Sequence, residues 1–333
     1  MAKRDKALSY NRIMEIAYNF RTSRILLTAF ELDIFTILSD SKKTSKEIAD
    51  AISADERATD RLLNALTAME FLKKKNNKFF NTPAALKYLV KGKPDYLGGL
   101  GHTINLWKTW STLTEAVKKG TSVFLRAEIG ERGDDWLESF IAAMHTRGRI
   151  QAKEIASLLN LKKVKRVIDV GGGSGAYSFA FVKARKGIKA IIFDLPNVVP
   201  ITQKYIESEG LSGKVETLKG NYLIDDIGKG YDMAFLSAVI HSNSPDECKH
   251  LFKKCADVLN PGGCLVVLDH VMSEDRINPP AGVLFALNML VGTANGDTYT
   301  ENEIKSWMKE AGFSGFKRKD TESGTALIIG HKK

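Results

Sequence analysis

The chain has 333 residues, of which 44% are hydrophobic and 26% charged, and a formal net charge of +10. The length suits two domains, and the composition is typical of a soluble globular protein. No apolar run reaches the roughly 18 residues that a membrane span needs. No apolar stretch follows the basic N-terminus as it would in a signal peptide. We therefore expect a cytoplasmic protein without a membrane span.

The cysteines and the basic residues each exclude a class of site. Cys248, Cys255 and Cys264 have the wrong number and spacing for a disulfide framework or a zinc site, so we predict reduced thiols and no metal. The Lys and Arg residues form short clusters without interleaved aromatic residues. A groove for nucleic acid favours longer basic runs of that kind. We therefore predict no nucleic-acid partner.

Residues 1–100 have the pattern of a mainly helical winged-helix domain. Apolar residues recur at helical spacing over 8–38, and Thr44-Ser45-Lys46-Glu47 has the pattern of a capping box. A helix through 60–66 and a hairpin turning at Asn76-Asn77 complete the winged helix. This scaffold serves either DNA binding or dimerisation. The long apolar first helix favours a homodimer, with DNA binding as the alternative.

Residues 101–160 are predicted to form a helical connector that is rich in aromatic side chains. Such an aromatic stripe occurs in helical cores, but the same residue types also line small-molecule pockets. We assign five residues to a substrate pocket on this connector: Trp107, Trp110, Phe140, Met144 and His145.

The cofactor site is predicted where a buried strand over 167–170 runs into Gly171-Gly-Gly-Ser-Gly175 and then a helix. A glycine loop at the end of a strand lets a nucleotide approach the backbone and the helix N-terminus. A second strand, over 190–193, ends at Asp194, whose carboxylate can accept hydrogen bonds from ribose hydroxyls. The loop therefore predicts a nucleotide-like cofactor.

Two cofactors fit this loop. Gly171-x-Gly173-x-x-Ala176 also satisfies the dinucleotide fingerprint of NAD-dependent oxidoreductases. S-adenosylmethionine is favoured because Asp169 precedes the glycines, because one complete sheet follows, and because a hairpin over 315–330 closes the chain. NAD remains the alternative.

Further strands are predicted over 214–218, 231–239 and 264–268. Ligands of open parallel sheets bind at the carboxyl ends of the strands. The polar residues near those ends could instead cap a helix or close a turn. They are Asn221, Tyr222, Ser237, His241, Asp269 and His270.

The chain resembles the plant-type small-molecule O-methyltransferases and their bacterial relatives over nearly its whole length. The resemblance rests on the segments 167–175, 193–199, 241–248 and 259–263. It implies a Rossmann-like class I methyltransferase domain over 161–333, with a mostly parallel seven-stranded sheet and a C-terminal antiparallel hairpin. It also implies S-adenosylmethionine as cofactor, S-adenosylhomocysteine as product, and a homodimer joined through the winged-helix domain. Its implied cofactor residues are Asp169, Gly171, Gly173, Gly175, Asp194, Leu195, Asn221, Tyr222 and Ser237.

The base position departs from the family pattern. Relatives read His-Asp-Trp-x-Asp-Glu-His, with the second histidine as general base, whereas this chain has Glu247 there. Three alternatives follow: Glu247 as base, another histidine such as His241, His270 or His145, or an acceptor that ionises without help. Glu247 could also lie on the first turn of a helix and favour its dipole.

We therefore predict a methyltransferase that acts on a small aromatic or polycyclic metabolite, with O-methylation favoured. C-methylation and a relative that binds the cofactor without methylating are the alternatives.

Overall fold

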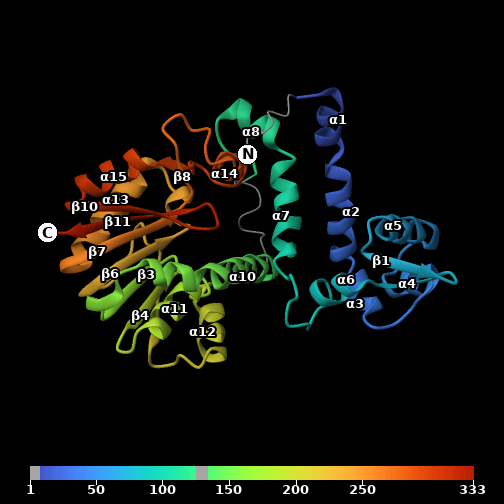
Figure 1. The fold of residues 1–333 in the computed structure, drawn as a ribbon, viewed down its shortest axis with the longest axis horizontal. Helices are drawn as coiled ribbons and strands as arrows, with labels where there is room; N and C mark the ends of the chain where they lie inside the picture. The colour runs from blue at the N-terminus through green and yellow to red at the C-terminus, as the bar shows by residue number, and fades with distance from the viewer. Residues whose placement is uncertain (1–7, 125–133) are drawn as a thin grey trace, which may run out of the picture. The chain divides into compact units, whose positions relative to one another are not determined.

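The computed structural model describes residues 8–124 and 134–333 (Figure 1). The chain divides into two compact units, Met1–Asn105 and Leu106–Lys333. Most of the residues that we predicted as a connector therefore group with the second unit. Among the described residues, no helix is both long enough and apolar enough to cross a membrane.

The first unit is a set of short helices with one hairpin. Its elements are α1 Tyr10–Tyr18, α2 Phe20–Glu31, α3 Ile34–Leu38, α4 Ser45–Ala51, α5 Glu56–Ala68, β1 Leu72–Lys75, β2 Lys78–Asn81 and α6 Pro83–Tyr88, and α7 Leu100–Trp110 begins at its end. The predicted capping box is present: the Thr44 hydroxyl accepts from the Glu47 N–H, and the Glu47 carboxylate accepts from the Thr44 N–H. The N-terminus of α4 is thereby satisfied by its own side chains.

The predicted hairpin joins β1 and β2 through two residues with positive φ. Asn76 and Asn77 have φ of 52° and 57°, and Lys75 pairs with Lys78 across the turn. Asparagine tolerates this left-handed conformation, and a two-residue turn of this kind matches the twist of paired strands. The hairpin packs on a core that includes Phe35, Leu66 and Phe79.

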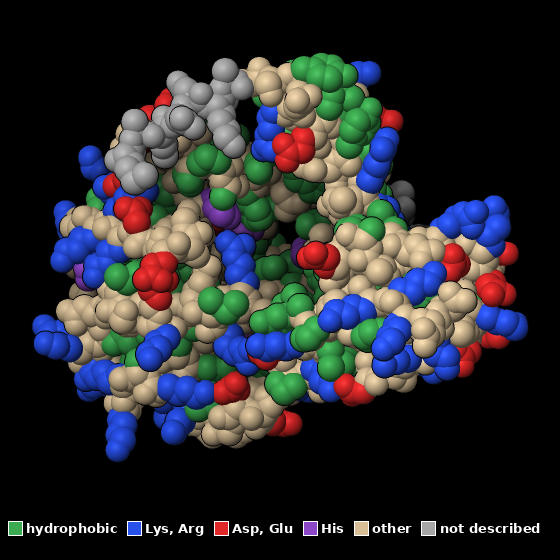
Figure 2. All heavy atoms as spheres, turned by 45° about the vertical axis from the view of Figure 1, so that its right-hand side comes forward, with side chains coloured by type: hydrophobic (Ala, Val, Ile, Leu, Met, Phe, Trp, Pro, Cys, Tyr) green, Lys and Arg blue, Asp and Glu red, His purple; other side chains and the backbone are tan. Residues whose placement is uncertain are grey.

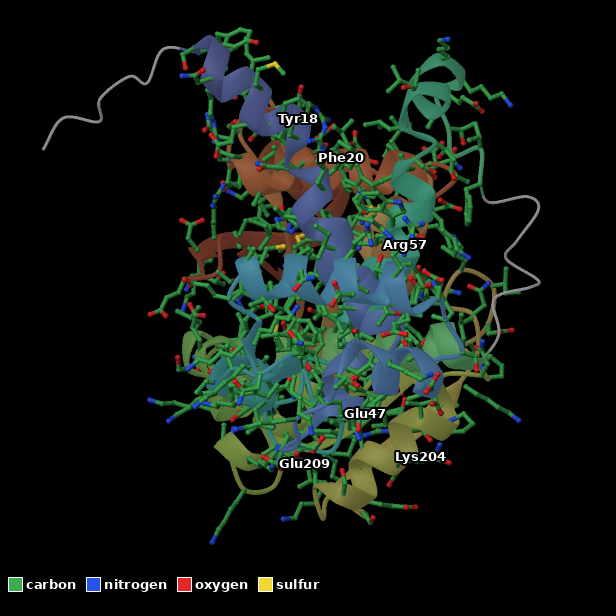
Figure 3. The ribbon with its side chains drawn as sticks, turned by 90° about the vertical axis from the view of Figure 1, so that its right-hand side faces the viewer. Tyr18, Phe20, Glu47, Arg57, Lys204 and Glu209 are labelled. Carbon is green, nitrogen blue, oxygen red and sulfur yellow. The ribbon has the colours of Figure 1, made fainter. Side chains whose placement is uncertain are left out.

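Helix α1 carries apolar side chains that are about half exposed or more. None of its residues is buried, and the exposed fractions of Tyr10, Ile13 and Ile16 are 75%, 49% and 56%. Tyr18 and Phe20, at the junction with α2, are also about half exposed (Figure 3). A contiguous exposed apolar face of this kind marks an interaction surface.

The second unit is built on a seven-stranded sheet in the order β10-β11-β7-β6-β3-β4-β5. Strands β3 to β7 pair in parallel, whereas β11 lies antiparallel between β7 and β10. This confirms the predicted sheet and its closing hairpin. The strands are β3 Arg166–Val170, β4 Lys189–Asp194, β5 Val215–Lys219, β6 Tyr231–Ser237, β7 Leu259–Asp269, β10 Phe313–Asp320 and β11 Ala326–Lys332, and β8 Val271–Met272 pairs separately with β9 Tyr299–Thr300.

Helices cover both faces of this sheet (Figure 1). Alternate residues of β6 face opposite layers: Met233 and Phe235 pack with helices within 134–208, whereas Ala234 and Leu236 pack with helices over 245–258 and 301–310. The near-continuous apolar strands therefore follow from burial on both faces. The helices of this unit are α8 Leu113–Lys119, α10 Asp134–Leu158, α11 Ala176–Ala184, α12 Val199–Ser208, α13 Pro245–Val258, α14 Pro280–Gly292 and α15 Glu301–Glu310, with short 3₁₀ helices η2 Leu161–Lys163 and η3 Ile240–Ser242.

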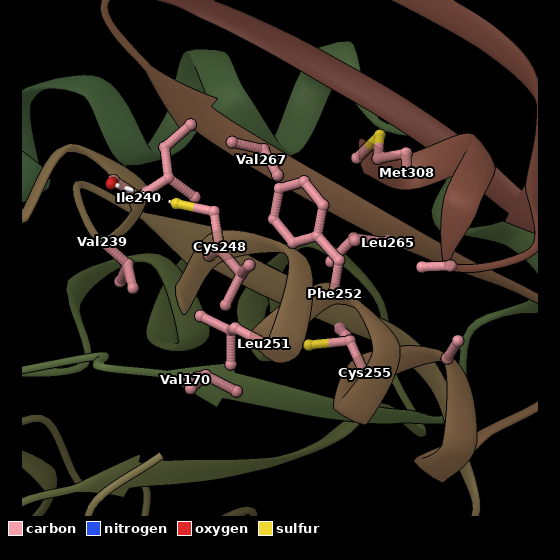
Figure 4. Close-up of a cluster of buried hydrophobic side chains, with 14 of the residues drawn as sticks. Val170, Val239, Ile240, Cys248, Leu251, Phe252, Cys255, Leu265, Val267 and Met308 are labelled. Atoms are coloured by element: carbon pink, nitrogen blue, oxygen red, sulfur yellow. Dashed lines mark hydrogen bonds between the residues drawn. The ribbon is translucent and has the colours of Figure 1, made fainter. Parts of the chain in front are cut away.

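The cysteines belong to this core, as Figure 4 shows for Cys248 and Cys255. Both side chains are fully buried, and the Cys248 thiol lies 3.4 Å from the Ile240 carbonyl oxygen, to which it donates. Burial raises the pKa of Cys255 to about 12 and that of Cys264 to about 11. These thiols therefore act as small apolar side chains and not as nucleophiles.

The excess positive charge forms no single patch on the face that Figure 2 shows. Figure 2 shows Lys and Arg side chains scattered over the visible face, with Asp and Glu side chains between them. Most of the recorded ion pairs are exposed, as in Lys46 with Asp50 and Lys253 with Asp257. Such pairs stabilise a fold by less than about 1 kcal/mol each.

Candidate active site

A cavity of about 380 Å³ lies at the carboxyl ends of the central strands of the second unit. Its walls come from the ends of β3, β4, β6 and β7, from the glycine loop after β3, and from α10. The strand order reverses beside β3, where connections leave to opposite sides. In open α/β sheets this switch point is where ligands bind.

The glycine loop shapes one wall of the cavity. Gly171 and Gly173 line it with φ of +68° and +55°, a conformation that residues with side chains rarely adopt. Gly175 is not among the lining residues. A Cβ at Gly175 would lie 2.4 Å from Ile192 Cδ1, so this glycine lets α11 pack closely on the sheet.

Asp169, the last residue but one of β3, is a buried carboxylate in this cavity. It is 1% exposed, and its Oδ2 accepts a hydrogen bond from the Ser178 hydroxyl at 2.7 Å. Its Oδ1 is buried and has no hydrogen-bond partner among the described residues. Burial raises the pKa of Asp169 to about 7. Such a carboxylate is suited to receive a positively charged group of a ligand.

Asp194 ends β4 on the other side of the glycine loop. Its two oxygens accept from the Gly173 N–H at 2.7 Å and from the Leu195 N–H at 2.8 Å. Burial raises the pKa of this carboxyl despite those two bonds. Each carboxylate oxygen keeps a further lone pair for a ligand hydroxyl. Leu195, which is 44% exposed, lines the cavity beside it.

Tyr222 and Asn221 follow β5, and only Tyr222 lines the cavity. The Tyr222 hydroxyl bonds the amide of Asn243. The side-chain oxygen of Asn221 accepts from the Leu223 N–H at 2.9 Å, which closes a local turn. The side chain of Asn221 therefore closes a turn, which was the alternative to ligand binding for the polar residues after the strands.

His241 and Asp269 form a buried pair that faces the cavity. His241 lies in η3, which begins shortly after the end of β6, and Asp269 ends the neighbouring strand β7. The His241 Nδ1 lies 2.8 Å and 3.0 Å from the two carboxylate oxygens of Asp269, and the residues are 8% and 3% exposed. A carboxylate bonded to Nδ1 holds the proton there, and leaves Nε2 as the lone-pair nitrogen.

Glu247 does not line the cavity. It is the third residue of α13, where its carboxylate accepts the Ser244 N–H at 2.7 Å while its own N–H donates to the Ser244 hydroxyl. This capping box satisfies the start of α13. The structure therefore shows Glu247 in the capping role rather than beside a reacting group.

The predicted substrate-pocket residues divide into two groups. Phe140 and Met144 of α10 line the cavity, where Phe140 stacks on Trp136 with ring centroids 5.4 Å apart. Three others do not line it: Trp107, Trp110 and His145. The Trp110 Nε1 donates to the Asn288 amide oxygen. His145 bonds Ser174 and lines a separate surface groove between α10 and α11.

The sequence did not predict every residue that lines the cavity, and three of those it missed are polar side chains near the glycine loop. Arg147, Gln151 and Tyr177 line the cavity, and the Tyr177 hydroxyl donates to the Gln151 side chain at 3.0 Å. Phe140, Met144, Arg147 and Gln151 recur at helical spacing. Extending the aromatic stripe along that spacing would have found the polar members.

The comparisons with known proteins agree with this geometry. A family model described as the O-methyltransferase domain matches residues 110–314, and one described as the O-methyltransferase dimerisation domain matches 14–91. The chain is 28% identical to 3-hydroxy-5-methyl-1-naphthoate 3-O-methyltransferase of Streptomyces sahachiroi, over 91% of this chain and 89% of the relative. It is 27% identical to the tetracenomycin polyketide synthesis 8-O-methyl transferase TcmO of Streptomyces glaucescens, over 96% of each. A solved structure, PigF with SAH, has a TM-score of 0.89 at 23% identity, and covers 98% of this chain and 100% of that one.

The raised pKa of Asp169 predicts a stability that depends on pH. Between the unfolded pKa near 3.9 and the folded value of about 7, the folded protein holds a proton that the unfolded chain has lost, so this residue lowers stability as pH rises. We expect Asp169→Asn to raise the free energy of unfolding by about 1–3 kcal/mol at pH 8 and by much less at pH 5. Thermal unfolding of both proteins at the two pH values measures this. An equal difference at both values would show that Asp169 does not titrate in this way.

Proposed function

This chain belongs to the O-methyltransferase family, and from that premise we propose that its cavity methylates a hydroxyl of a small aromatic or polycyclic compound beside His241. The enzyme is S-adenosylmethionine-dependent. The observation that carries the proposal is the buried His241–Asp269 pair, which opens onto the same cavity as the glycine loop.

The residues around the glycine loop fit the cofactor. S-adenosylmethionine supplies, when bound, a methyl group activated by a positively charged sulfur. Asp194 has free lone pairs for ribose hydroxyls, and the unpaired oxygen of Asp169 suits the ammonium group. Arg147 is the one Lys or Arg among the described lining residues, so we assign it the carboxylate of the cofactor. Leu195 and Tyr222 supply apolar surface for the adenine.

His241 acts as the general base on the acceptor. A phenol with a pKa near 10 is only about 0.1% ionised at neutral pH, so forming its anion costs about 4 kcal/mol. The phenol proton passes to His241 Nε2, while the Nδ1–H remains bonded to Asp269, whose charge stabilises the imidazolium. A base held in this way typically contributes 10²–10⁴-fold in rate. The proton then leaves to solvent.

The side chains that line the cavity indicate the chemical class of the methyl acceptor. Trp136, Phe140, Met144 and Leu137 give one side of the cavity an aromatic and apolar surface. Flat aromatic rings pack well on such a surface. The two curated relatives described above are named for a hydroxynaphthoate and for a tetracenomycin polyketide. These names support an aromatic hydroxyl compound as the acceptor.

Replacing His241 separates the two candidate bases. We expect His241→Gln to lower kcat at least about 100-fold, because the proton acceptor is removed, with the Kd for S-adenosylhomocysteine within about threefold of wild type. Labelled S-adenosylmethionine and a panel of hydroxylated aromatic compounds provide the assay.

Glu247→Gln is the matched control, because glutamine preserves the capping box. It should retain kcat within about threefold. A 100-fold loss in Glu247→Gln, with His241→Gln near wild type, would return the base role to Glu247.

The cofactor assignment is tested by calorimetry with S-adenosylhomocysteine. Asp194→Ala and Arg147→Met should each weaken binding by about 1.5–3 kcal/mol, because each removes charge-assisted hydrogen bonds. Arg149→Met is the control, since Arg149 lies on the same helix but lines the separate groove. Equal effects of Arg147→Met and Arg149→Met would argue against a contact between Arg147 and the cofactor.

The match to the dimerisation domain begins at residue 14, within α1, and we propose that a second copy of the chain covers the exposed apolar face of this helix. Ile13 and Ile16 are one helical turn apart and about half exposed. We expect Ile13→Asp combined with Ile16→Asp to produce a monomer in size-exclusion chromatography, because two buried charges would oppose association. Ile150→Asp, at a residue of α10 that is 76% exposed, should leave a dimer. A dimer that survives the double substitution would place the interface elsewhere.

A further inference from the structure

His270 is a buried side chain of the cavity that the reaction described above does not use. It follows Asp269 directly, is 8% exposed, and lines the cavity. Its Nδ1 is buried without a hydrogen-bond partner among the described residues, and its recorded hydrogen bond is made by the backbone N–H alone. Nε2 has no hydrogen-bond partner among the described residues either, so the ring has a nitrogen free to bond a ligand in the cavity.

The ring of His270 is held in place from one side. Phe285, on α14, packs against His270 and against His241, with ring centroids 4.7 Å apart in each case. The two imidazoles therefore flank a single phenyl ring at the same end of the cavity. Because packing already fixes the ring, a ligand that bonds His270 pays little of the entropy cost of ordering it.

The environment also sets which nitrogen donates. Burial lowers the pKa of His270; the Asp269 charge opposes this, whereas Arg147 and His241 lower the pKa further, so the neutral imidazole is favoured at neutral pH. A neutral imidazole has one N–H and one lone-pair nitrogen. Orphaned buried N–H groups are rarer than unpaired acceptors, which favours the lone pair on the buried Nδ1. Nε2 then carries the hydrogen and offers it to an oxygen atom.

We propose that His270 binds a second oxygen atom of the acceptor, next to the hydroxyl that His241 deprotonates. The substrate class is therefore an aromatic compound with two neighbouring oxygens, on adjacent carbons of one ring or on facing positions of two fused rings. His241 takes the proton of one hydroxyl, and the Nε2–H of His270 donates to the other oxygen. This inference rests on the proposed function and adds the acceptor's second functional group to it.

The proposal predicts discrimination between isomers. A site that hydrogen-bonds a substrate oxygen rejects an analogue without it, because a buried polar group is left unpaired. Catechol and hydroquinone have the same atoms, as do 1,8- and 1,5-dihydroxynaphthalene, and only the first of each pair has neighbouring oxygens. We expect kcat/KM to favour the first member of at least one pair by about tenfold or more.

Substitution of His270 tests whether this residue causes the preference for the isomer with neighbouring oxygens. His270→Phe keeps an aromatic contact with Phe285 and removes both nitrogens, so the isomer preference should fall below about threefold while the Kd for S-adenosylhomocysteine stays unchanged. His270→Gln retains a donor and should keep part of the preference, which also covers a failure of the Phe variant to fold. His331→Phe, at an exposed residue of β11 that does not line the cavity, should keep all of it.

Binding gives a second measurement that does not depend on turnover. In the complex with S-adenosylhomocysteine, calorimetry should show catechol binding weakened at least fivefold by His270→Phe and hydroquinone binding unchanged. Equal turnover of the isomers, a preference that survives in His270→Phe, or no methylation of any isomer by protein that binds S-adenosylhomocysteine would each overturn the inference. Failure to bind the cofactor, or full activity in His241→Gln, would instead contradict the proposed function.

Discussion

The hydrogen bond between His241 Nδ1 and the Asp269 carboxylate is the interaction on which the site depends. It joins the turn after β6 to the end of β7, so it fixes one strand end against its neighbour. Asp269 also accepts from the His270 N–H, so a single carboxylate orients the backbone on one side and the imidazole on the other. The parallel pairing of β6 with β7 places both residues at the same edge. Without that register, the histidine would have no partner in the core.

The second constraint is the close approach of α11 to the sheet. Ser178 of α11 bonds Asp169 of β3, and Gly175 lacks the side chain that would separate the two elements. The glycine loop and the first residue of α11 therefore lie at the wall of the cavity. Apolar side chains pack on both faces of the sheet, as described above for β6. This packing holds α11 and β3 in position. The chemistry at the cavity thus relies on geometry set in the core.

The parts of the structure that could be predicted from the sequence are those with local signals. The capping box at Thr44, the turn at Asn76-Asn77 and the strand before Gly171 each depend on a few neighbouring residues, and each is present. The pairing of His241 with Asp269 joins residues 28 positions apart, and it depends on the register of β6 with β7, which no local pattern specifies. The position of Glu247, in contrast, follows from a local signal. Ser244 and Glu247 have the spacing of a capping box, and that local signal, rather than the motif position, determined where the carboxylate lies. We predicted from composition alone that Trp107 and Trp110 line the substrate pocket. Composition does not distinguish a residue of the core from one that lines a cavity.

The unpaired oxygen of Asp169 also affects how ligand binding releases protons. In the free protein this carboxyl has a pKa of about 7, so near neutral pH a fraction of the molecules hold a proton there. The ammonium group of a cofactor in the proposed position favours the ionised form, because an opposite charge nearby lowers the pKa of a carboxyl. Cofactor binding is then coupled to the release of part of a proton to the buffer. The heat measured on binding would include the ionisation heat of that buffer, and affinity would rise with pH through this range. Asp169 lowers the stability of the cofactor-free protein, and the same residue makes the affinity for the cofactor depend on pH.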